Sequence, residues 1–385
     1  MIMSRTEMRR PAAVLSFDLA RTLISQYGSP LLAVSRSSIA QAYRTMHDHL
    51  PGVELFYAAK ANAHSLILQT LEAQGASIDI CSIGELNAAI AAGFTPDRMI
   101  HTHPCKSDPN IVECHQRGLR WFVYDDEYEL DKIARLDLDV NMILRVALSA
   151  PSCALNLSSK FGADGDEAMR LLIAAKRRDL RPCGISFHVG SQCIDPRDFY
   201  PAMAKVRELY DEAMDIGIDI QLIDIGGGFP APYRGQSLMS LASYCDVVAD
   251  GLRSHFAEIP VRIIAEPGRV LCAEAVTLVT RVIGKSKRNG TTWYYLDDGL
   301  YGSFSAKRPG HTDFDLLVEN EPSAAQFPCV IAGPTCDSGD VLYRDYHLPE
   351  LEIGAIVMVP SMGAYTSASA CGFNGLPVAG SIAID

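Results

Sequence analysis

Eight short apolar runs, each ending near polar or glycine residues, constrain the fold of this chain most strongly. Runs of this kind are typical of buried parallel strands. They end at Lys60 and within residues 79–82, 100–103, 122–124, 144–146, 187–190, 225–228 and 265–269. Helical patterns separate them, among them residues 65–73, 83–92, 108–116, 166–177, 195–216 and 240–256. Eight strand–helix units predict an α/β fold built on a closed (β/α)8 barrel, which typically takes about 250 residues.

The main alternative architecture is an open, doubly wound parallel sheet. Its usual signature is a GxGxxG turn directly after the first strand, and the sequence lacks such a turn there. Polar or glycine residues at most of the strand ends also favour the barrel, because barrel active sites lie at the carboxyl ends of the strands.

The sequence pattern changes after Arg269. Residues 275–283, 292–296, 329–332 and 356–360 read as strands that Gly, Pro and Asn turns separate. An additional short strand is expected within residues 29–34. We therefore predict an N-terminal segment over residues 1–30, a barrel over 31–272 and a mostly β C-terminal domain over 273–385.

Composition argues against several kinds of partner. The net charge of −12 disfavours nucleic acid and anionic membranes, because both reward clustered Lys and Arg. No run approaches the roughly 18 apolar residues of a spanning helix, and residues 1–11 lack the apolar core of a signal peptide. Eleven cysteines without a CxxC pair are typical of reduced thiols. We expect a cytoplasmic protein without a metal site.

Lys60 ends the first apolar run of the predicted barrel, in the segment FYAAKAN. A charge at the carboxyl end of a barrel strand lies where such enzymes keep their active sites. A solvated lysine at a strand end is the common alternative. Lys60 alone does not decide between the two.

Two later strand ends indicate a phosphate site. Gly226, Gly227 and Gly228 leave the backbone free to bring N–H groups close to an anion, although a triple glycine also suits a tight turn. The last strand ends in Glu266, Pro267, Gly268 and Arg269, which adds a glycine and a cation. Together the two segments predict a phosphate site at the last two strand ends of the barrel.

The remaining polar strand ends match the needs of one cofactor. His188, in SFHVGSQ, follows the sixth strand, where its ring can face the group that the phosphate carries; a structural histidine is the alternative. Glu266 is a candidate acid for keeping a pyridine nitrogen protonated. A lysine, a phosphate site, a histidine and a carboxylate together predict pyridoxal phosphate bound covalently to Lys60.

Six motifs then mark a known family. FYAAKAN, SFHVGSQ, DIGGGFP, EPGR, GPTCDSGD and GAYT occur in the family's order between residues 29 and 375. The chain resembles the fold-type III pyridoxal-phosphate decarboxylases, which include ornithine, lysine, arginine and diaminopimelate decarboxylases, and its motifs are most similar to those of ornithine decarboxylase. The resemblance implies an alanine-racemase-like barrel and a β domain that also takes in residues 1–30.

The resemblance also implies roles for the cofactor site. Lys60 would bind the cofactor covalently, Glu266 would pair with the ring nitrogen, and His188 would stack on the ring. Asp79 resembles the family's acidic residue beside the lysine, and Arg145 matches another cofactor-site position. The phosphate would be held by Ser191, Gly226, Gly227, Gly228, Gly268, Arg269 and Tyr365.

A homodimer with shared active sites is a further implication of the resemblance. One subunit would lend its partner Cys336, which returns a proton to the substrate's Cα as a general acid, and Asp337, which pairs with a distal ammonium. A buried packing cysteine is the alternative for Cys336. Phe373 would line the substrate pocket, and Lys160 resembles a lysine that forms a salt bridge between subunits.

The segment after Phe304 departs from the family pattern. Ornithine decarboxylases have an aspartate there that helps to bind the distal amine, whereas this chain has Gly310 followed by His311. Losing one of two carboxylates should weaken the pairing with a buried ammonium. Three explanations are open. Asp313 or Asp315 shifts into place, the substrate is longer or differently charged, or Lys307 and Arg308 receive an acidic or carrier-bound substrate, as in the glutamyl-carrier decarboxylases of antibiotic pathways.

We therefore expect a decarboxylase that acts at Cα of a small-molecule amino acid. The favoured substrate is a basic L-amino acid of the ornithine or lysine type, in polyamine biosynthesis. The alternatives are a modified or carrier-bound amino acid in a specialised pathway, an amino-acid racemase, and a non-catalytic decarboxylase homologue. Cys336 and Asp337 favour decarboxylation over racemisation, and the intact set of cofactor residues disfavours a non-catalytic homologue.

Overall fold

The structure is a computed structural model that describes residues 8–148, 150–155, 158–307, 312–319 and 324–385. The chain divides into two compact units. Of the described residues, Met8 and those within 40–230 and 239–271 form the barrel unit, and those within 9–39, 231–238 and 272–385 form the β unit.

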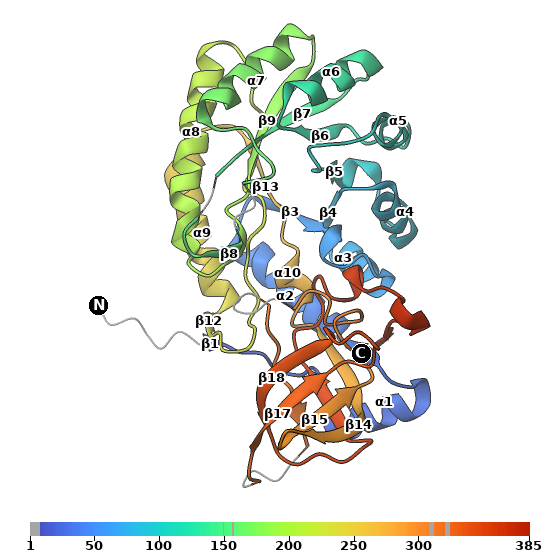
Figure 1. The fold of residues 1–385 in the computed structure, drawn as a ribbon. Helices are drawn as coiled ribbons and strands as arrows, with labels where there is room; N and C mark the ends of the chain where they lie inside the picture. The colour runs from blue at the N-terminus through green and yellow to red at the C-terminus, as the bar shows by residue number, and fades with distance from the viewer. Residues whose placement is uncertain (1–7, 149, 156–157, 308–311, 320–323) are drawn as a thin grey trace, which may run out of the picture. The chain divides into compact units, whose positions relative to one another are not determined.

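A closed barrel of parallel strands forms the barrel unit, in the spatial order β11-β13-β3-β4-β5-β6-β7-β9 (Figure 1). Its strands are β3 (Val53–Ala58), β4 (Ser77–Ile80), β5 (Met99–His101), β6 (Trp121–Tyr124), β7 (Asn141–Val146), β9 (Arg181–Phe187), β11 (Leu222–Asp224) and β13 (Arg262–Ala265). Six of these strands contribute to one buried apolar cluster, which consists of Phe56, Ile100, Val123, Ile143, Leu222 and Ile264. The predicted (β/α)8 barrel is confirmed.

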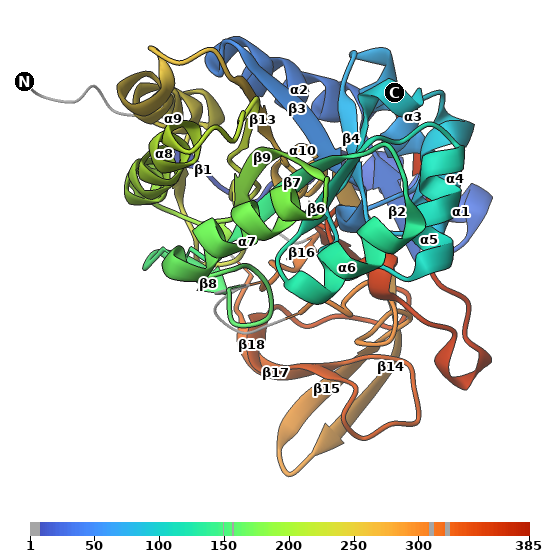
Figure 2. The ribbon, with the colours of Figure 1, turned by 90° about the horizontal axis from the view of Figure 1, so that it is seen from above.

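Helices between the strands cover the outside of this barrel, and Figure 2 shows α5, α6 and α7 along it. Serine and aspartate caps fix where several of them begin: Ser82 accepts a hydrogen bond from the N–H of Glu85, and Asp164 accepts one from Glu167. The helices are α2 (Arg36–His49), α3 (Ser65–Ala73), α4 (Ile83–Ala92), α5 (Asp108–Gln116), α6 (Glu127–Leu136), α7 (Gly165–Arg177), α8 (Phe199–Asp215), α9 (Leu241–Phe256) and α10 (Arg269–Cys272).

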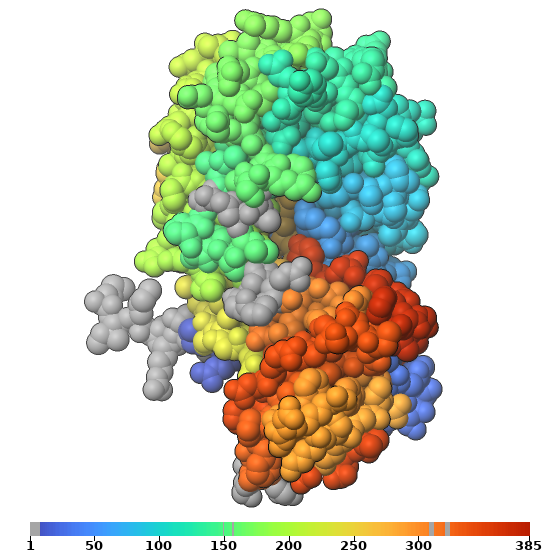
Figure 3. Space-filling model, viewed as in Figure 1, coloured from blue at the N-terminus to red at the C-terminus, as the bar shows by residue number. Residues whose placement is uncertain are grey.

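Side chains close most of the space between these elements, as the green and blue surface of the barrel unit shows (Figure 3). A two-stranded antiparallel ribbon of β8 (Cys153–Leu155) and β10 (Ser191–Cys193) belongs to the same unit. Among the described residues, no helix combines the length and the apolar character that crossing a membrane requires.

The β unit is built on a mixed sheet with the order β16-β19-β14-β15-β17-β18, in which β2 also pairs with β14 and β20. Helix α1 (Phe17–Tyr27) packs against this sheet through Ala20, Leu23 and Ile24. The predicted mostly β domain is confirmed. Its strands are β2 (Leu31–Val34), β14 (Val276–Arg288), β15 (Thr291–Leu296), β16 (Leu317–Val318), β17 (Phe327–Ala332), β18 (Val341–Leu348), β19 (Ile356–Val359) and β20 (Gly380–Ala383).

The chain passes between the two units more often than the predicted division into three consecutive segments implies. Residues 31–39 belong to the β unit and not to the barrel, because β2 pairs antiparallel with residues 276–279. Residues 231–238 also belong to the β unit. There the guanidinium of Arg234 lies 4.1 Å from the ring centroid of Tyr346.

Candidate active site

Lys60 forms ion pairs with two carboxylates at the carboxyl end of the barrel. It lies in a single 3-10 turn, η1 (Ala59–Ala61), directly after β3. Its Nζ is 2.9 Å from Oδ2 of Asp79 and 3.8 Å from Oε2 of Glu266. Because β3 pairs with both β4 and β13, the three residues come from adjacent strand ends.

Asp79 is fully buried. Its Oδ2 accepts a hydrogen bond from Lys60, and its Oδ1 accepts one from the hydroxyl of Thr102. Burial raises the pKa of Asp79 to about 7, although the positive charge of Lys60 opposes this rise. The two hydrogen bonds fix the carboxyl, so Asp79 holds the Lys60 amine at a defined point beside Glu266.

The glycine segment after β11 packs too closely against other strand ends to accept side chains. Gly226 and Gly228 have φ values of 66° and 109°, which favour glycine. A Cβ at Gly226 would lie 2.1 Å from the carbonyl oxygen of Phe187, and one at Gly227 would lie 2.7 Å from that of Glu266. This packing places backbone without side chains beside Glu266, and an anion site formed by backbone N–H groups requires such close access.

Arg269 and Ser191 supply polar groups in the same unit. Arg269 is 7% exposed, and its Nη2 lies 3.2 Å from Oγ of Ser191. Strand β10, which contains Ser191, is tied to the glycine segment because the N–H of Cys193 donates to the carbonyl of Gly228 at 2.9 Å. The cation, the hydroxyl and the glycine backbone thus belong to one connected structure.

His188 follows β9 and lies against the glycine segment. A Cβ at Gly227 would be 3.1 Å from its Nε2. Its Nδ1 accepts a hydrogen bond from the N–H of Gly190 at 3.0 Å, so the neutral ring carries its proton on Nε2. Burial, together with the charges of Arg145 and Lys60, lowers the pKa of His188 to about 3.

The lowered pKa of His188 predicts a pH dependence of stability. The unfolded chain binds a proton at this histidine below about pH 6.5, whereas the folded protein binds it only near pH 3. The stability contribution is therefore present above pH 6.5 and is lost as the pH falls. Unfolding in urea from pH 8 to pH 4 should show the native protein losing stability relative to His188→Gln. A constant difference in stability between the two proteins would contradict a histidine that stays neutral in the folded protein.

Arg145 and Lys160 share one aromatic neighbour, Phe161. The Arg145 guanidinium lies 5.6 Å from the ring centroid of Phe161, and Nζ of Lys160 lies 4.9 Å from the same centroid. Arg145 also contributes to the lowered pKa of His188. For Lys160, the salt bridge between subunits stays a prediction.

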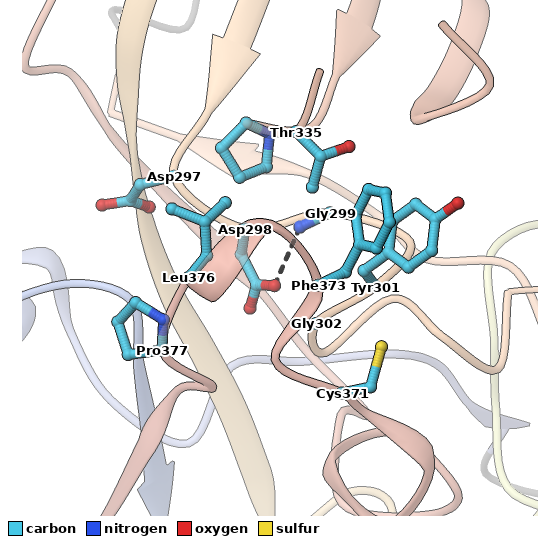
Figure 4. Close-up of a pocket in the computed structure, with 11 residues that line it drawn as sticks. Asp297, Asp298, Gly299, Tyr301, Gly302, Thr335, Cys371, Phe373, Leu376 and Pro377 are labelled. Atoms are coloured by element: carbon cyan, nitrogen blue, oxygen red, sulfur yellow. Dashed lines mark hydrogen bonds between the residues drawn. The ribbon is translucent and has the colours of Figure 1, made fainter. Parts of the chain in front are cut away.

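The β unit contains a second group of predicted site residues. Asp337 accepts hydrogen bonds from the hydroxyl of Tyr301 at 2.6 Å and from the N–H of Gly339 at 2.9 Å, and these bonds lower its pKa. The rings of Tyr301 and Phe373 stack with centroids 4.2 Å apart and line one pocket (Figure 4). Cys336 is exposed, and Tyr365 has a φ of 60°. Their predicted roles toward phosphate and substrate stay predictions.

The segment with the unusual glycine lies partly outside the described residues, because Gly310, His311 and Arg308 are not among them. Its described neighbours are paired with one another. Nζ of Lys307 lies 3.2 Å from Asp313. Arg234 lies 3.8 Å from both Asp313 and Asp315.

Three contacts of the site were not predicted from the sequence. The Thr102 hydroxyl binds Asp79, and the Tyr301 hydroxyl binds Asp337. Asp224, which is fully buried, accepts a hydrogen bond from the N–H of Gly226 at 2.8 Å. Asp224 is the first residue of the motif DIGGGFP, and this position beside the glycines could have indicated a role in the site. No sequence signal indicated the two hydroxyl contacts.

The barrel unit therefore has the groups that pyridoxal phosphate requires. Lys60 can bind its aldehyde, Glu266 can pair with its ring nitrogen, and the glycine backbone with Arg269 and Ser191 suits its phosphate. The glycine packing distances support this fit, because a Cβ at any of the three glycines would clash with a neighbouring strand end and move this backbone.

Comparison with known proteins agrees with this fit. The family model described as pyridoxal-dependent decarboxylase, pyridoxal binding domain, matches residues 36–273. The chain belongs to the family of pyridoxal-dependent decarboxylases, and it is an amino-acid decarboxylase that uses pyridoxal phosphate.

Several relatives match nearly the whole chain. The lysine/ornithine decarboxylase of Selenomonas ruminantium is 37% identical over 368 residues, which cover 96% of this chain and 93% of the relative. The ornithine decarboxylase of Mus musculus is 35% identical, over 85% of this chain and 74% of the relative. A crystal structure of lysine/ornithine decarboxylase from Vibrio vulnificus, complexed with putrescine, is 38% identical, with a TM-score of 0.89 and coverage of 97% and 99%.

Proposed function

We propose that this protein decarboxylates a basic L-amino acid of the lysine or ornithine type and releases a diamine, as in polyamine biosynthesis. The observation that carries the proposal is Asp337, whose pKa is lowered and which lies beside the stacked rings of Tyr301 and Phe373. An ionised carboxylate next to an aromatic surface suits an ammonium on an apolar chain. The names of the Selenomonas and Vibrio relatives support the same substrate class.

In this proposal the barrel residues hold the cofactor at which carbon dioxide is lost from the substrate's Cα. Pyridoxal phosphate, when bound, supplies a conjugated ring that takes up the electron pair left when carbon dioxide departs. Lys60 would hold the cofactor covalently through its amine. Glu266 would pair with the ring nitrogen and keep it protonated, and His188 would pack on the ring as a neutral side chain that adds no positive charge. Asp79 orients the Lys60 amine through their 2.9 Å hydrogen bond.

Cys336 completes the reaction in a shared active site. Its thiol returns a proton to the Cα from which carbon dioxide has left, as a general acid. We propose that the cysteine and Asp337 serve the site of the other subunit in a homodimer, with Lys160 in a salt bridge between subunits and Tyr365 at the phosphate. The eleven free thiols suit work in the reducing cytoplasm.

An acidic or carrier-bound substrate is less compatible with the described residues. The alternative needs Lys307 to face the substrate, but its side chain is 9% exposed and lies 3.2 Å from Asp313. Its Nζ also lies 4.2 Å from the ring centroid of Tyr343. The same pairing engages Asp313, and Arg234 engages Asp315, so neither aspartate is placed to replace the family's missing carboxylate without breaking an existing pair.

The role of Asp337 is tested by comparing substrates with and without a distal charge. Removing a hydrogen bond to a charged group costs about 1.5–3 kcal/mol, so Asp337→Ala should lower kcat/KM for lysine or ornithine roughly 10- to 150-fold. Norleucine, which lacks the distal amine, should react slowly but equally with both proteins. Asp345→Ala, at an exposed aspartate of the same unit, is the control. An equal loss for norleucine would contradict a specific role in ammonium binding.

Subunit mixing tests the shared site. Lys60→Ala and Cys336→Ala proteins should each be inactive, because each lacks one half of every site. Mixed dimers, however, contain one site with both residues intact, so activity should return on mixing. Native mass spectrometry verifies that subunits have exchanged. Mixed dimers without activity would show that both residues act within one chain.

A further inference from the structure

Asp224 occupies a position that the mechanism above does not use. It ends β11, and strand alternation places it on the same face as Leu222, a member of the barrel's apolar cluster. Its Oδ1 accepts the N–H of Gly226. Its Oδ2 is buried and receives no N–H or O–H from the residues that the structure describes. The Asp224 carboxyl and Glu266 meet at one residue, because Gly226 donates its N–H to Asp224 and its carbonyl accepts the N–H of Glu266 at 2.8 Å. The charge of Glu266 accordingly acts on the Asp224 carboxyl and raises its pKa.

Two carboxyl groups that meet away from water cannot both stay ionised, because nothing screens their like charges. One proton between them turns this repulsion into a hydrogen bond. Glu266 lies 3.8 Å from the Lys60 ammonium, which offers its carboxylate a compensating positive charge. Among the described residues, Asp224 accepts a hydrogen bond only from the N–H of Gly226. Burial together with the Glu266 charge raises the pKa of Asp224 well above its usual range.

We propose that Asp224 is a positioning residue that keeps its proton and donates it, from Oδ2, as a hydrogen bond to the ionised carboxylate of Glu266. The inference rests on the proposed pairing of Glu266 with the cofactor's ring nitrogen. If Asp224 were ionised, Glu266 would take up the proton and could no longer hold one at the ring nitrogen as its counter-ion. Asp224 thereby determines which form of Glu266 faces the cofactor.

Infrared spectroscopy of the holoenzyme at pH 8 tests where the proton resides. A protonated carboxyl band should be present, should shift on labelling with ¹³C-aspartate, should persist in Asp79→Asn and should vanish in Asp224→Asn. A band that shifts with ¹³C-glutamate instead, or no such band, would overturn the inference. The spectrum does not depend on turnover, so it separates a failure here from a failure of the proposed decarboxylation.

A conservative pair of variants tests the positioning role. Asparagine can still donate to Glu266, so Asp224→Asn should bind pyridoxal phosphate with a dissociation constant within about threefold of native. Asp224→Leu removes the donor, and we expect a dissociation constant at least tenfold higher, with a changed pH titration of the cofactor absorbance. Equal behaviour of the two variants would contradict a hydrogen bond to Glu266.

A separate observation concerns Cys153 and Cys193, which lie directly opposite each other in the antiparallel ribbon of β8 and β10. Neither N–H binds the other residue, since Cys153 donates to Ala150 and Cys193 donates to Gly228. Opposite residues at such non-hydrogen-bonded positions have Cα atoms about 4.5 Å apart, within the roughly 4.4–6.8 Å that a disulfide spans. A hydrogen bond between the thiols raises the pKa of Cys153 and lowers that of Cys193.

We infer that Cys153 and Cys193 are an oxidation site, at which a peroxide converts two thiols into one disulfide. One thiolate attacks the peroxide, so that an S–O bond forms, the O–O bond breaks and water leaves after protonation. The second thiol then attacks that sulfur, so that the S–S bond forms and the S–O bond breaks. The hydroxyl leaves as a second water with the proton of the second thiol. Cys153 is partly exposed and gives the oxidant access, whereas Cys193 is buried. The bond would adjoin the phosphate-site residues, because Ser191 is in the same strand.

Mass spectrometry after peroxide treatment of the reduced holoenzyme tests this site. We expect a Cys153–Cys193 cross-linked peptide, a mass lower by two hydrogens and reversal by dithiothreitol. Cys105→Ser, at an exposed cysteine, should form the same cross-link, and Cys153→Ser should form none. Oxidation of Cys193 to a sulfinic acid, or an unchanged pair when Cys336 and Cys371 are fully oxidised, would overturn the inference.

Discussion

Replacing Lys60 by alanine is expected to lower kcat/KM for decarboxylation at least about 10⁴-fold, a loss of roughly 5.5 kcal/mol of transition-state stabilisation. The variant loses the covalent anchor of the cofactor and leaves the buried Asp79 without the ammonium 2.9 Å away. Lysine decarboxylation assays and the absorbance of the bound cofactor measure the two consequences separately.

Lys60→Arg separates charge from covalent chemistry. Arginine can keep a positive charge beside Asp79 and Glu266, so the variant should fold and retain some affinity for the cofactor, but it should be as inactive as Lys60→Ala. Lys205→Ala, at an exposed lysine of α8, should remain fully active. A kcat/KM of Lys60→Ala within tenfold of the native value would show that catalysis does not depend on Lys60.

Substitution of Gly226 by alanine should have the second-largest effect. The new Cβ would lie 2.1 Å from the carbonyl oxygen of Phe187, at a φ of 66°. Overpacking and the left-handed backbone together predict a stability loss of about 2–4 kcal/mol. The displaced glycine segment should bind pyridoxal phosphate at least about 10²-fold more weakly, because its N–H groups no longer meet the phosphate.

Gly75→Ala is the matched control for this substitution. Gly75 has a similar φ of 84°, but a Cβ there would meet nothing within 4 Å. The control carries only the penalty of the left-handed conformation, about 1–2 kcal/mol, and should bind the cofactor normally. Urea unfolding and cofactor titration compare the two variants. Equal losses of cofactor affinity would show that the close approach at Gly226 does not shape the site.

The barrel could be predicted because its signals are local. Each strand is a short apolar run with a polar or glycine end, and the helices between them have recognisable caps such as Ser82. Lys60, the three glycines and Arg269 could be proposed as site residues because each lies at the end of such a run. A closed parallel barrel brings strand ends together, so these residues meet although they are far apart in the sequence.

Contacts that depend on long-range register could not be predicted. Strand β2 joins the β unit because it pairs with residues 276–279, and nothing in residues 31–34 specifies that partner. The pairing of Arg234 with Asp313 and Asp315 likewise depends on how distant segments pack. Cys153 and Cys193 become neighbours only through the register of a short ribbon. The family resemblance pointed to Asp79 beside Lys60, but nothing pointed to Thr102, whose hydroxyl donates to Asp79.

Carbon dioxide release is the most direct test of the proposed function. Purified protein with pyridoxal phosphate is assayed with carboxyl-labelled lysine, ornithine, arginine, diaminopimelate and glutamate, and the product amines are identified. We predict release from lysine or ornithine, with cadaverine or putrescine formed in equal amount, and at least about 10²-fold lower kcat/KM for glutamate, whose distal charge repels Asp337. If neither lysine nor ornithine releases carbon dioxide while the cofactor is bound to Lys60, the proposed substrate class is contradicted.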